Sequence, residues 1–515
     1  MSGRIRRWLL VALTACCLLA AMLPLAAARA AGDGVRRNRA LLVGVDDFVS
    51  HPSIYPASTN NVFAMQAVLQ ASSAPFETIM IPDAPVTGAQ ALATLIADTF
   101  AGADADDVSY LYLCTHGEFD GDPASEPVLL LSDGRTEERL TPKVLEAALA
   151  TVPSIKVVLL DACYSGAFIG KGMRWRAAVL PFESDAYKVI ASSGAMEASW
   201  YWNAGTGAQP AADGAFPQGA FYFTQALSQG LSPRYGFPAD LNRDGSVTLS
   251  ELYAMLMETH AASIPQVYPQ EDGFVVFAYD PATVSADDRA PIGDVTFSDV
   301  VTGEGGGVLG LEYIALRPVR VAYQVVRQQN GAWRFDEAQL LYDNVEQYTA
   351  FGDEPGAVTA GRKVRKLRLN LTDGQTSGYI LLQLLSIENG KLAVHAGKVI
   401  AIPPEAGDLQ LCVEADESFA LGTPQELAVF VAHAWPCQLS VTIVDAAGAM
   451  VRRLCHKQST RPQHLNPEGS MFYWNGRDRD GQSVAAGMYR VRVSATLGGQ
   501  TFTAESGPIA LHGGS

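Results

Sequence analysis

The sequence predicts an α/β domain, with a mainly parallel sheet flanked by helices, followed by two all-β sandwich domains. From residue 38 to about residue 279, short apolar runs alternate with helical patterns, an order typical of a parallel sheet covered by helices. Beyond this point apolar residues recur at every second position, with turn signals such as Asn389-Gly390 between the runs, as in antiparallel hairpins. A Pro- and Gly-marked junction at Pro403–Gly407 divides this half into two segments of immunoglobulin size. We therefore expect domains over residues 31–285, 290–405 and 408–515.

The elements of the α/β domain follow one another in the order that a parallel sheet requires. The first apolar run, Ala40–Val45, has the length of a buried strand, and Asn60 and Asn61 can cap the helix that follows. Thr141 and Pro142 form a cap and a first-turn proline of a later helix. Two further buried strands are expected, at Val108–Leu113 and Ile155–Leu160. Ligands of such sheets gather at the carboxyl ends of the strands.

The composition is that of a globular, acidic protein. The chain has 515 residues, of which 48% are hydrophobic and 18% charged, and its 37 Lys and Arg against 54 Asp and Glu give a net charge of −17. Proteins that follow nucleic-acid phosphates carry clustered basic residues, whereas only short runs such as Arg362–Arg368 are present here. Nucleic acid is therefore excluded as an expected partner.

Residues 1–30 have the pattern of a secretory signal peptide. Three arginines precede the apolar stretch Trp8–Leu25, and Ala28-Arg29-Ala30 follows it shortly afterwards. Two alternatives remain, an uncleaved membrane anchor and a lipoprotein signal through Cys16, although the apolar run continues past that cysteine. Because no later stretch has the length of a membrane helix, we expect a secreted, extracellular protein, either released or associated with the cell surface.

The mature chain would keep an odd number of cysteines. The five outside the signal segment are Cys114, Cys163, Cys412, Cys437 and Cys455. An odd count in an exported protein implies at least one free thiol, and the absence of a CxxC pair argues against structural zinc. Cys437 and Cys455 flank the turn at 445–448 and would form a disulfide if the strand register brings them face to face. Cys114 follows a buried strand and is expected to be a core residue.

A histidine and a cysteine follow two of the predicted inner strands. His116-Gly117 follows the predicted strand Val108–Leu113 after two residues. Cys163 follows the predicted strand Ile155–Leu160, also after two residues. A thiol needs a nearby base or cation to form its thiolate, and an imidazole supplies this near neutral pH and can protonate a departing amine. The backbone N–H groups of Gly117 and Cys163 are candidates for an oxyanion hole. Singly, each residue is better explained as structural; together they indicate a catalytic dyad.

These motifs resemble those of the caspase-like cysteine peptidases, the clan that contains caspases, metacaspases and legumains. Thr115-His116-Gly117 is similar to the His-Gly motif of that family, and Asp161-Ala162-Cys163-Tyr164-Ser165-Gly166 to the Asp-x-Cys-x-Ser-Gly form of metacaspases. The separation of His116 and Cys163 is close to the caspase spacing. Arg39–Phe48 resembles the first core strand of the family and Val189–Gly194 the strand that borders its specificity pocket. The resemblance covers about residues 38–280 and implies a caspase-like fold with Cys163 as nucleophile and His116 as base.

The residue preference is implied less directly. The Gln-Ala-Cys-x-Gly signature of caspases is missing, so cleavage after aspartate is not implied. By resemblance, the candidates for the specificity pocket are Asp46, Asp161, Glu197 and Ser199. A desolvated carboxylate there would favour Lys or Arg before the cut, and asparagine is the alternative, because Glu197–Trp200 resembles a stretch of legumains. Lys171, Arg174 and Arg176 lie in the loop after the nucleophile, where family members often cleave themselves.

Residues 240–251 fit the twelve-residue calcium loop of an EF-hand. Calcium prefers carboxylate and amide oxygens, with a turn-permitting glycine at position six, here Gly245, and a bidentate acid at position twelve. The ligands would be Asp240, Asn242, Asp244, the Ser246 carbonyl and Glu251. The alternative is a turn that only caps the following helix. Since Pro233–Pro238 interrupts the incoming helix and no second hand is present, we expect a weak, structural or regulatory Ca²⁺ site and no organic cofactor.

The last domain resembles the Ig-like domain of flagellar hook-cap type found at the end of secreted bacterial proteases. The resemblance rests on Tyr473–Gly481 and Ala486–Val491. The whole chain is thus predicted to be a secreted cysteine-type endopeptidase that cleaves peptide or protein substrates, with β domains that contact a surface or an extracellular protein. Two alternatives stay open: a catalytically inactive binding or adhesion protein, and a legumain-like transpeptidase.

Overall fold

The computed structural model describes most of the chain. The described residues are 32–122, 124–172, 181–203, 219–260, 262–284, 291–298, 301–303, 306–329, 332–343, 357–369, 378–388, 391–402, 409–422, 426–460, 469–497 and 500–513. The predicted signal peptide at 1–30, both domain junctions, and Arg174 and Arg176 lie outside them. No helix among the described residues is both long and apolar enough to cross a membrane.

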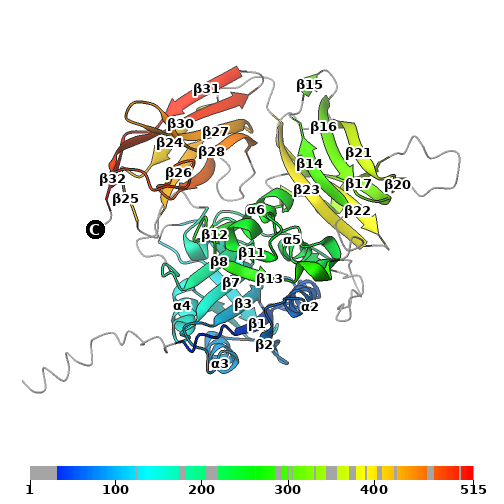
Figure 1. The fold of residues 1–515 in the computed structure, drawn as a ribbon, viewed down its shortest axis with the longest axis vertical. Helices are drawn as coiled ribbons and strands as arrows, with labels where there is room; N and C mark the ends of the chain where they lie inside the picture. Colours follow the sequence, from blue (N-terminus) through cyan, green and yellow to red (C-terminus); the bar gives the residue numbers. More distant parts are fainter. Residues whose placement is uncertain are drawn as a thin grey trace, which may run out of the picture.

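The α/β domain is built on a six-stranded sheet with the order β12-β8-β7-β3-β1-β2 (Figure 1). All of its strands are parallel to their neighbours except β12, which runs antiparallel to β8. The strands are β1 (Asn38–Gly44), β2 (Phe76–Met80), β3 (Val108–Cys114), β7 (Ile155–Asp161), β8 (Tyr187–Ala191) and β12 (Gln266–Tyr268). Because every residue of β3 is buried, both faces of the sheet are covered, as parallel sheets require. The expectation of a mainly parallel, helix-flanked sheet is confirmed.

Within the described residues, five helices pack on this sheet in two groups (Figure 1). In the first group α2 packs against α5 and α5 against α6, and in the second α3 packs against α4. Their bounds are α2 (Ala57–Gln70), α3 (Ala89–Thr99), α4 (Pro142–Ala150), α5 (Tyr222–Gly230) and α6 (Leu249–Thr259). The predicted cap of α4 is confirmed, since the Thr141 side chain accepts a hydrogen bond from the Val144 N–H.

The predicted start of α2 is wrong. The helix begins at Ala57, so Asn60 and Asn61 lie buried within its first turns and bond the backbone of Gly219 and Phe221. The carboxylate of Asp46, at the end of β1, accepts hydrogen bonds from the N–H groups of Ser58 and Thr59 and so takes the place of a local cap.

The middle domain consists of two antiparallel sheets that share one apolar core. One contains β14 (Ile292–Phe297), β15 (Val301–Gly303), β16 (Gly306–Ala315) and β21 (Gly361–Leu369). The other contains β17 (Val319–Gln329), β18 (Ala332–Trp333), β19 (Gln339–Tyr342), β20 (Ala357–Val358), β22 (Gly378–Glu388) and β23 (Lys391–Ile402). Leu309 from the first sheet and Val321 and Leu382 from the second lie in the same buried cluster. This is a sandwich arrangement.

The C-terminal domain has the same two-sheet layout. One sheet contains β24 (Cys412–Ala415), β26 (Leu427–Ala432) and β29 (Gly469–Trp474). The other contains β25 (Ser418–Ala420), β27 (Gln438–Asp445), β28 (Met450–Ser459), β30 (Gly487–Leu497), β31 (Gln500–Glu505) and β32 (Ile509–His512). Trp474, which is 1% exposed, lies between them in the core. In Figure 1 both β domains lie against the side of the α/β domain that carries α6 and β12.

The register of the C-terminal domain does not permit the expected disulfide. Cys455 on β28 faces Val441 on β27, whereas the Cys437 backbone bonds to Thr460 at the far end of the hairpin. The two cysteines are equally far from the turn in sequence, so a regular hairpin would bring them face to face. Three irregularities in the β27–β28 ladder shift the register, and they therefore do not face each other. All five described cysteines carry free thiols.

Candidate active site

The register of the sheet brings the His116 and Cys163 loops together. In the parallel pair of β3 and β7, Cys114 lies opposite Asp161, so His116 and Cys163 stand at equivalent positions beyond the strand ends. A Cβ built on Gly117 would lie 2.0 Å from the carbonyl oxygen of Cys163. Only glycine therefore permits this approach, and the two segments of the predicted dyad are in direct contact.

His116 is held by backbone and aromatic contacts. Its Nε2 lies 3.3 Å from the carbonyl oxygen of Pro52, and its ring packs against Phe48 and His51 with centroid distances of 4.5 and 4.9 Å. Because a carbonyl can only accept, Nε2 carries the proton and Nδ1 is left as the acceptor. Burial lowers the pKa of His116 below its usual 6.5, which keeps the ring neutral at neutral pH. A neutral imidazole with a free Nδ1 is the state that a general base needs.

The thiol of Cys163 is protonated in this arrangement. The side chain is half-buried, and Sγ donates to the carbonyl oxygen of Ser199 at 3.5 Å. Burial raises the pKa of Cys163 to about 11, and the negative charge of Asp161 adds to the rise. The residue that follows, Tyr164, has a left-handed backbone with φ of 59° and donates its N–H to the Glu197 carbonyl at 2.8 Å. The free protein thus holds a neutral thiol and a neutral imidazole.

Asp161 and Ser199, both predicted for the specificity pocket, form one buried network directly beside Cys163. Ser199 Oγ donates to Asp161 Oδ1 at 3.0 Å, and Thr224 Oγ1 donates to Oδ2 at 2.6 Å. The carboxyl group is completely buried, and this burial raises the pKa of Asp161 to about 6. Thr224 also bonds Tyr112, so α5 and β3 both support the network. Sequence reasoning missed Thr224, because no motif marks a helix residue that bonds a strand end far away in the sequence.

The other two pocket candidates are occupied with backbone groups. Asp46 binds the first turn of α2, as described above, and burial raises its pKa. The Glu197 side chain, which is buried, accepts hydrogen bonds from the N–H groups of Gly194 and Ile264 at 3.2 and 2.8 Å. The structure therefore brings Asp161, Glu197 and Ser199 to the Cys163 loop and leaves Asp46 at the end of β1, two strands away from β7.

The backbone of Gly117 is oriented away from its strand partner. In the ladder of β4 (Gly117–Glu118) and β5 (Val128–Ser132), Gly117 pairs with Leu129, and the N–H of Leu130 donates to the His116 carbonyl. Hydrogen-bonded and non-bonded pairs alternate in antiparallel ladders, so the Gly117 pair is a non-bonded one. The Gly117 N–H consequently points out of the ladder, as an oxyanion-hole donor must.

The predicted calcium loop turns its own side chains inward. Asp240 accepts hydrogen bonds from the N–H groups of Arg243 and Gly245 at 2.6 and 2.9 Å, and Glu251 caps α6 together with Thr248. Gly245 has a φ of +89°, as position six of such a loop requires. The oxygen-rich set of Asp240, Asn242, Asp244, Ser246 and Glu251 suits a hard cation. Among the described residues, the acidic groups that approach one another as metal ligands do are instead Asp33, before β1, and Asp104 and Asp106, between α3 and β3.

The protonated state of Cys163 makes a testable prediction. Alkylation by iodoacetamide requires the thiolate, so the rate at Cys163 in the free protein should be low at pH 7 and should rise up to about pH 11. The rate is measured by mass spectrometry on a Cys412→Ala background, which removes the exposed thiol. A plateau that is already reached near neutral pH would show a preformed thiolate–imidazolium pair and contradict the prediction.

Comparison with known proteins identifies the α/β domain. A family model described as "Caspase domain" (Peptidase_C14) matches residues 37–298, slightly more than half of the chain. Two solved structures are similar to it: dimeric latent PorU from Porphyromonas gingivalis, with 12% identity and a TM-score of 0.17, and caspase-1 from Spodoptera frugiperda, with 16% identity and a TM-score of 0.28. Each match covers 48% of this chain, and the matches span 22% of PorU and 92% of the insect caspase. No curated protein matches the sequence.

Proposed function

The chain belongs to the caspase-domain family of cysteine peptidases, and from this premise we propose that it is an endopeptidase with a dyad of Cys163 and His116. The observation that carries this proposal is the contact between Gly117 and the Cys163 carbonyl, because it sets the His116 loop against the nucleophile. The orientation of His116 supports it further, since the bond to Pro52 leaves Nδ1 available for the thiol proton.

The chemistry proceeds in two steps. Cys163 loses its proton to His116 Nδ1, and its sulfur attacks the peptide carbonyl while the backbone N–H groups of Gly117 and Cys163 stabilise the oxyanion. The peptide C–N bond breaks as His116 returns the proton to the departing amine, which leaves a thioester. Water, deprotonated by His116, then hydrolyses the thioester and frees Cys163. Since the pKa of Cys163 is raised in the free protein, the thiolate forms only as substrate binds and the proton is transferred.

We propose that the enzyme cleaves after Lys or Arg. Among the described residues, the carboxyl of Asp161 accepts hydrogen bonds from the hydroxyl groups of Ser199 and Thr224 and forms no ion pair. With a pKa of about 6, Asp161 carries a negative charge at neutral pH directly below the nucleophile. An uncompensated charge in a buried network attracts a basic side chain strongly.

The test is cleavage of a mixed peptide library by the chain without its signal segment, beside a Cys163→Ala variant. Cuts after Lys or Arg that vanish in the variant support the dyad and the basic preference. Cuts after Asn, or transfer of the acyl group to added amines, would favour a legumain-like transpeptidase. The absence of cleavage, also after limited nicking of the loop that follows Cys163, would favour the catalytically inactive binding protein.

We further propose that the protein is exported and binds Ca²⁺ at residues 240–251. The signal pattern at residues 1–30 supports export, and the two β domains, the last of them of Ig-like type, would then contact a surface or an extracellular protein. The bound cation would be held by Asp240, Asn242, Asp244, the Ser246 carbonyl and Glu251, and it would brace the start of α6.

A Glu251→Gln variant tests the calcium site. Glutamine keeps the capping box with Thr248, so the helix start is preserved, but it loses the charged bidentate ligand. In 10 mM CaCl₂ a millimolar site would stabilise the wild-type chain by about 1 kcal/mol, seen as a rise in the thermal midpoint, and the variant should show no rise. MgCl₂ at the same concentration serves as the control. An equal rise in both proteins would refute the site.

A further inference from the structure

The C-terminal domain reaches the loop that follows the nucleophile. Lys171, which is only 5% exposed, forms an ion pair with Glu426 and donates to Gln270 at 3.1 Å. Its Nζ lies 4.6 Å from the ring centroid of Tyr473. Glu426 directly precedes β26, and Tyr473 lies on the paired strand β29, opposite Ala428. One sheet of the C-terminal domain therefore presents both an acid and an aromatic ring to Lys171.

The next residue, Gly172, is held on both sides. Its N–H donates to the hydroxyl of Tyr473, and its backbone has a left-handed φ of +83°. A Cβ at this position would lie 2.6 Å from the N atom of Ala195, and the Lys171 carbonyl accepts the Ala195 N–H at 2.9 Å. Residues 171–172 are thus fixed between the C-terminal domain and the backbone at 194–195.

The backbone at 193–199 in turn holds the nucleophile. The Gly166 N–H donates to the Ser193 carbonyl, and the Tyr164 N–H to the Glu197 carbonyl, at 2.9 and 2.8 Å. The thiol of Cys163 itself lies against the Ser199 carbonyl. Loops 163–172 and 193–199 are therefore joined by hydrogen bonds that run from residues 171–172 to Tyr164, the residue next to Cys163.

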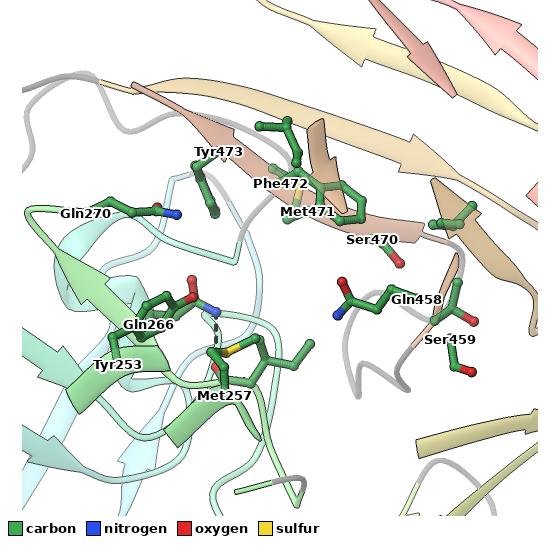
Figure 2. A pocket seen from close by; sticks show the side chains of 14 residues that line it. Tyr253, Met257, Gln266, Gln270, Gln458, Ser459, Ser470, Met471, Phe472 and Tyr473 are labelled. Atoms are coloured by element: carbon green, nitrogen blue, oxygen red, sulfur yellow. Dashed lines mark hydrogen bonds between the residues drawn. The ribbon is translucent and has the colours of Figure 1, made fainter. Parts of the chain in front are cut away.

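The contact between the two domains combines ion pairs and hydrogen bonds with apolar side chains such as Met257 and Phe472. A second ion pair joins Arg452 to Glu271, which also accepts from Asn475 at 2.9 Å. The interface also contains a cavity of about 150 Å³, and Figure 2 shows Gln266, Met257 and Gln270 on one side of it and residues 471–473 of β29 on the other. No apolar cluster among the described residues spans the α/β and C-terminal domains. The attachment to loop 163–172 thus depends on a few hydrogen bonds and ion pairs.

We propose that Glu426 and Tyr473 are positioning residues for the active-site loop, so that the C-terminal domain is part of the catalytic unit as well as an attachment module. They act through Lys171 and Gly172 on the backbone that carries Cys163. This inference rests on the proposed function, because positioning has a catalytic consequence only if Cys163 is the nucleophile. Its structural half, the clamp on residues 171–172, can be tested without catalysis.

The experiment compares Glu426→Gln and Tyr473→Phe with Glu271→Gln in the full mature chain. Glu271→Gln is the matched control. It breaks the ion pair between Arg452 and Glu271, which belongs to the same interface but does not involve loop 163–172. Each variant is made twice. With Cys163 intact, kcat and KM are measured on a peptide cut by the wild type. In a Cys163→Ala background, an added lysine-specific protease measures the exposure of the Lys171–Gly172 bond, and thermal midpoints verify folding.

We expect Glu426→Gln and Tyr473→Phe to lower kcat about tenfold with little change in KM, and to speed cleavage at Lys171 by at least about tenfold. Glu271→Gln should stay within about twofold of the wild type in both measurements. Unchanged cleavage at Lys171 in the two loop variants, or an equal loss of kcat in the control, would overturn the proposal. A wild-type chain that cuts no peptide would refute the proposed function, and cleavage at Lys171 would still decide whether the clamp exists.

Discussion

Replacing Cys163 with alanine or His116 with glutamine is expected to lower kcat for peptide hydrolysis by at least about a thousandfold. The first change removes the sulfur that, in the proposed mechanism, attacks the substrate carbonyl. The second keeps a polar side chain beside Pro52 but removes the imidazole that would accept the thiol proton. In the proposed mechanism the two groups act in the same proton transfer, so their losses should not add. The kcat of the double variant should lie within a few-fold of that of the slower single variant. Rates are compared on one fluorogenic peptide at a fixed pH.

A Cys412→Ala variant is the matched control for thiol chemistry elsewhere in the chain. Cys412 is the exposed cysteine of the C-terminal domain, and its removal should leave kcat unchanged. Additive losses in the double variant would mean that Cys163 and His116 act independently, which the dyad does not allow. Full activity of the Cys163→Ala variant would refute the assignment of the nucleophile.

The juxtaposition of the His116 and Cys163 loops could be predicted because it depends on local patterns. Buried parallel strands are short continuous apolar runs, and β3 and β7 are both of this kind. Polar and reactive residues directly after such runs lie at one edge of the sheet, so His116 and Cys163 were expected at neighbouring strand ends. The structure confirms that β3 and β7 are neighbours in register.

The surroundings of these loops could not be predicted, since they depend on contacts between distant parts of the chain. The carbonyl of Pro52 that orients His116 belongs to an irregular segment with no recognisable motif. Thr224 and Asp161 meet only because α5 packs over the sheet. Asp46 shows the same limit, because its carboxylate replaces the cap that the sequence offers at Asn60. Similarly, bulges in the β27–β28 ladder keep Cys437 and Cys455 from facing each other, and no turn signal in the sequence reveals these bulges.

The contacts of the β domains with the α/β domain could not be predicted from local sequence patterns either. Alternating apolar residues predict strands and a shared core, but they do not show which outer face meets another domain. Phe335 of the middle domain stacks on Tyr222 and approaches Trp200, the residue after Ser199. Glu426 and Tyr473 hold the other side of the same loops. Both β domains therefore contact the segments that surround Cys163, although the sequence predicted them as attachment modules.

Replacing Gly117 with alanine is expected to lower kcat by at least about a hundredfold. The new methyl carbon would lie 2.0 Å from the carbonyl oxygen of Cys163, a backbone atom that no side-chain rotation can move away. The His116 and Cys163 loops would have to separate, which would displace the Gly117 N–H from the oxyanion position and lengthen the proton transfer. A displacement of about 1 Å at a reacting centre costs on the order of a hundredfold in rate, so kcat should fall by at least this factor.

The same substitution should lower stability by about 1–3 kcal/mol, measured by urea unfolding of the α/β domain within the full chain. Gly273→Ala is the matched control, because a Cβ at Gly273 meets no atom within 4 Å and the change tests only the loss of a glycine from the same domain. If Gly117→Ala keeps both wild-type kcat and wild-type stability, the loops do not approach as closely as the structure shows. The proposed role of the Gly117 N–H in the oxyanion hole would then be refuted as well. If kcat falls while stability and the control are unchanged, the strain is confined to the active site, and the oxyanion donor rather than the fold has been lost.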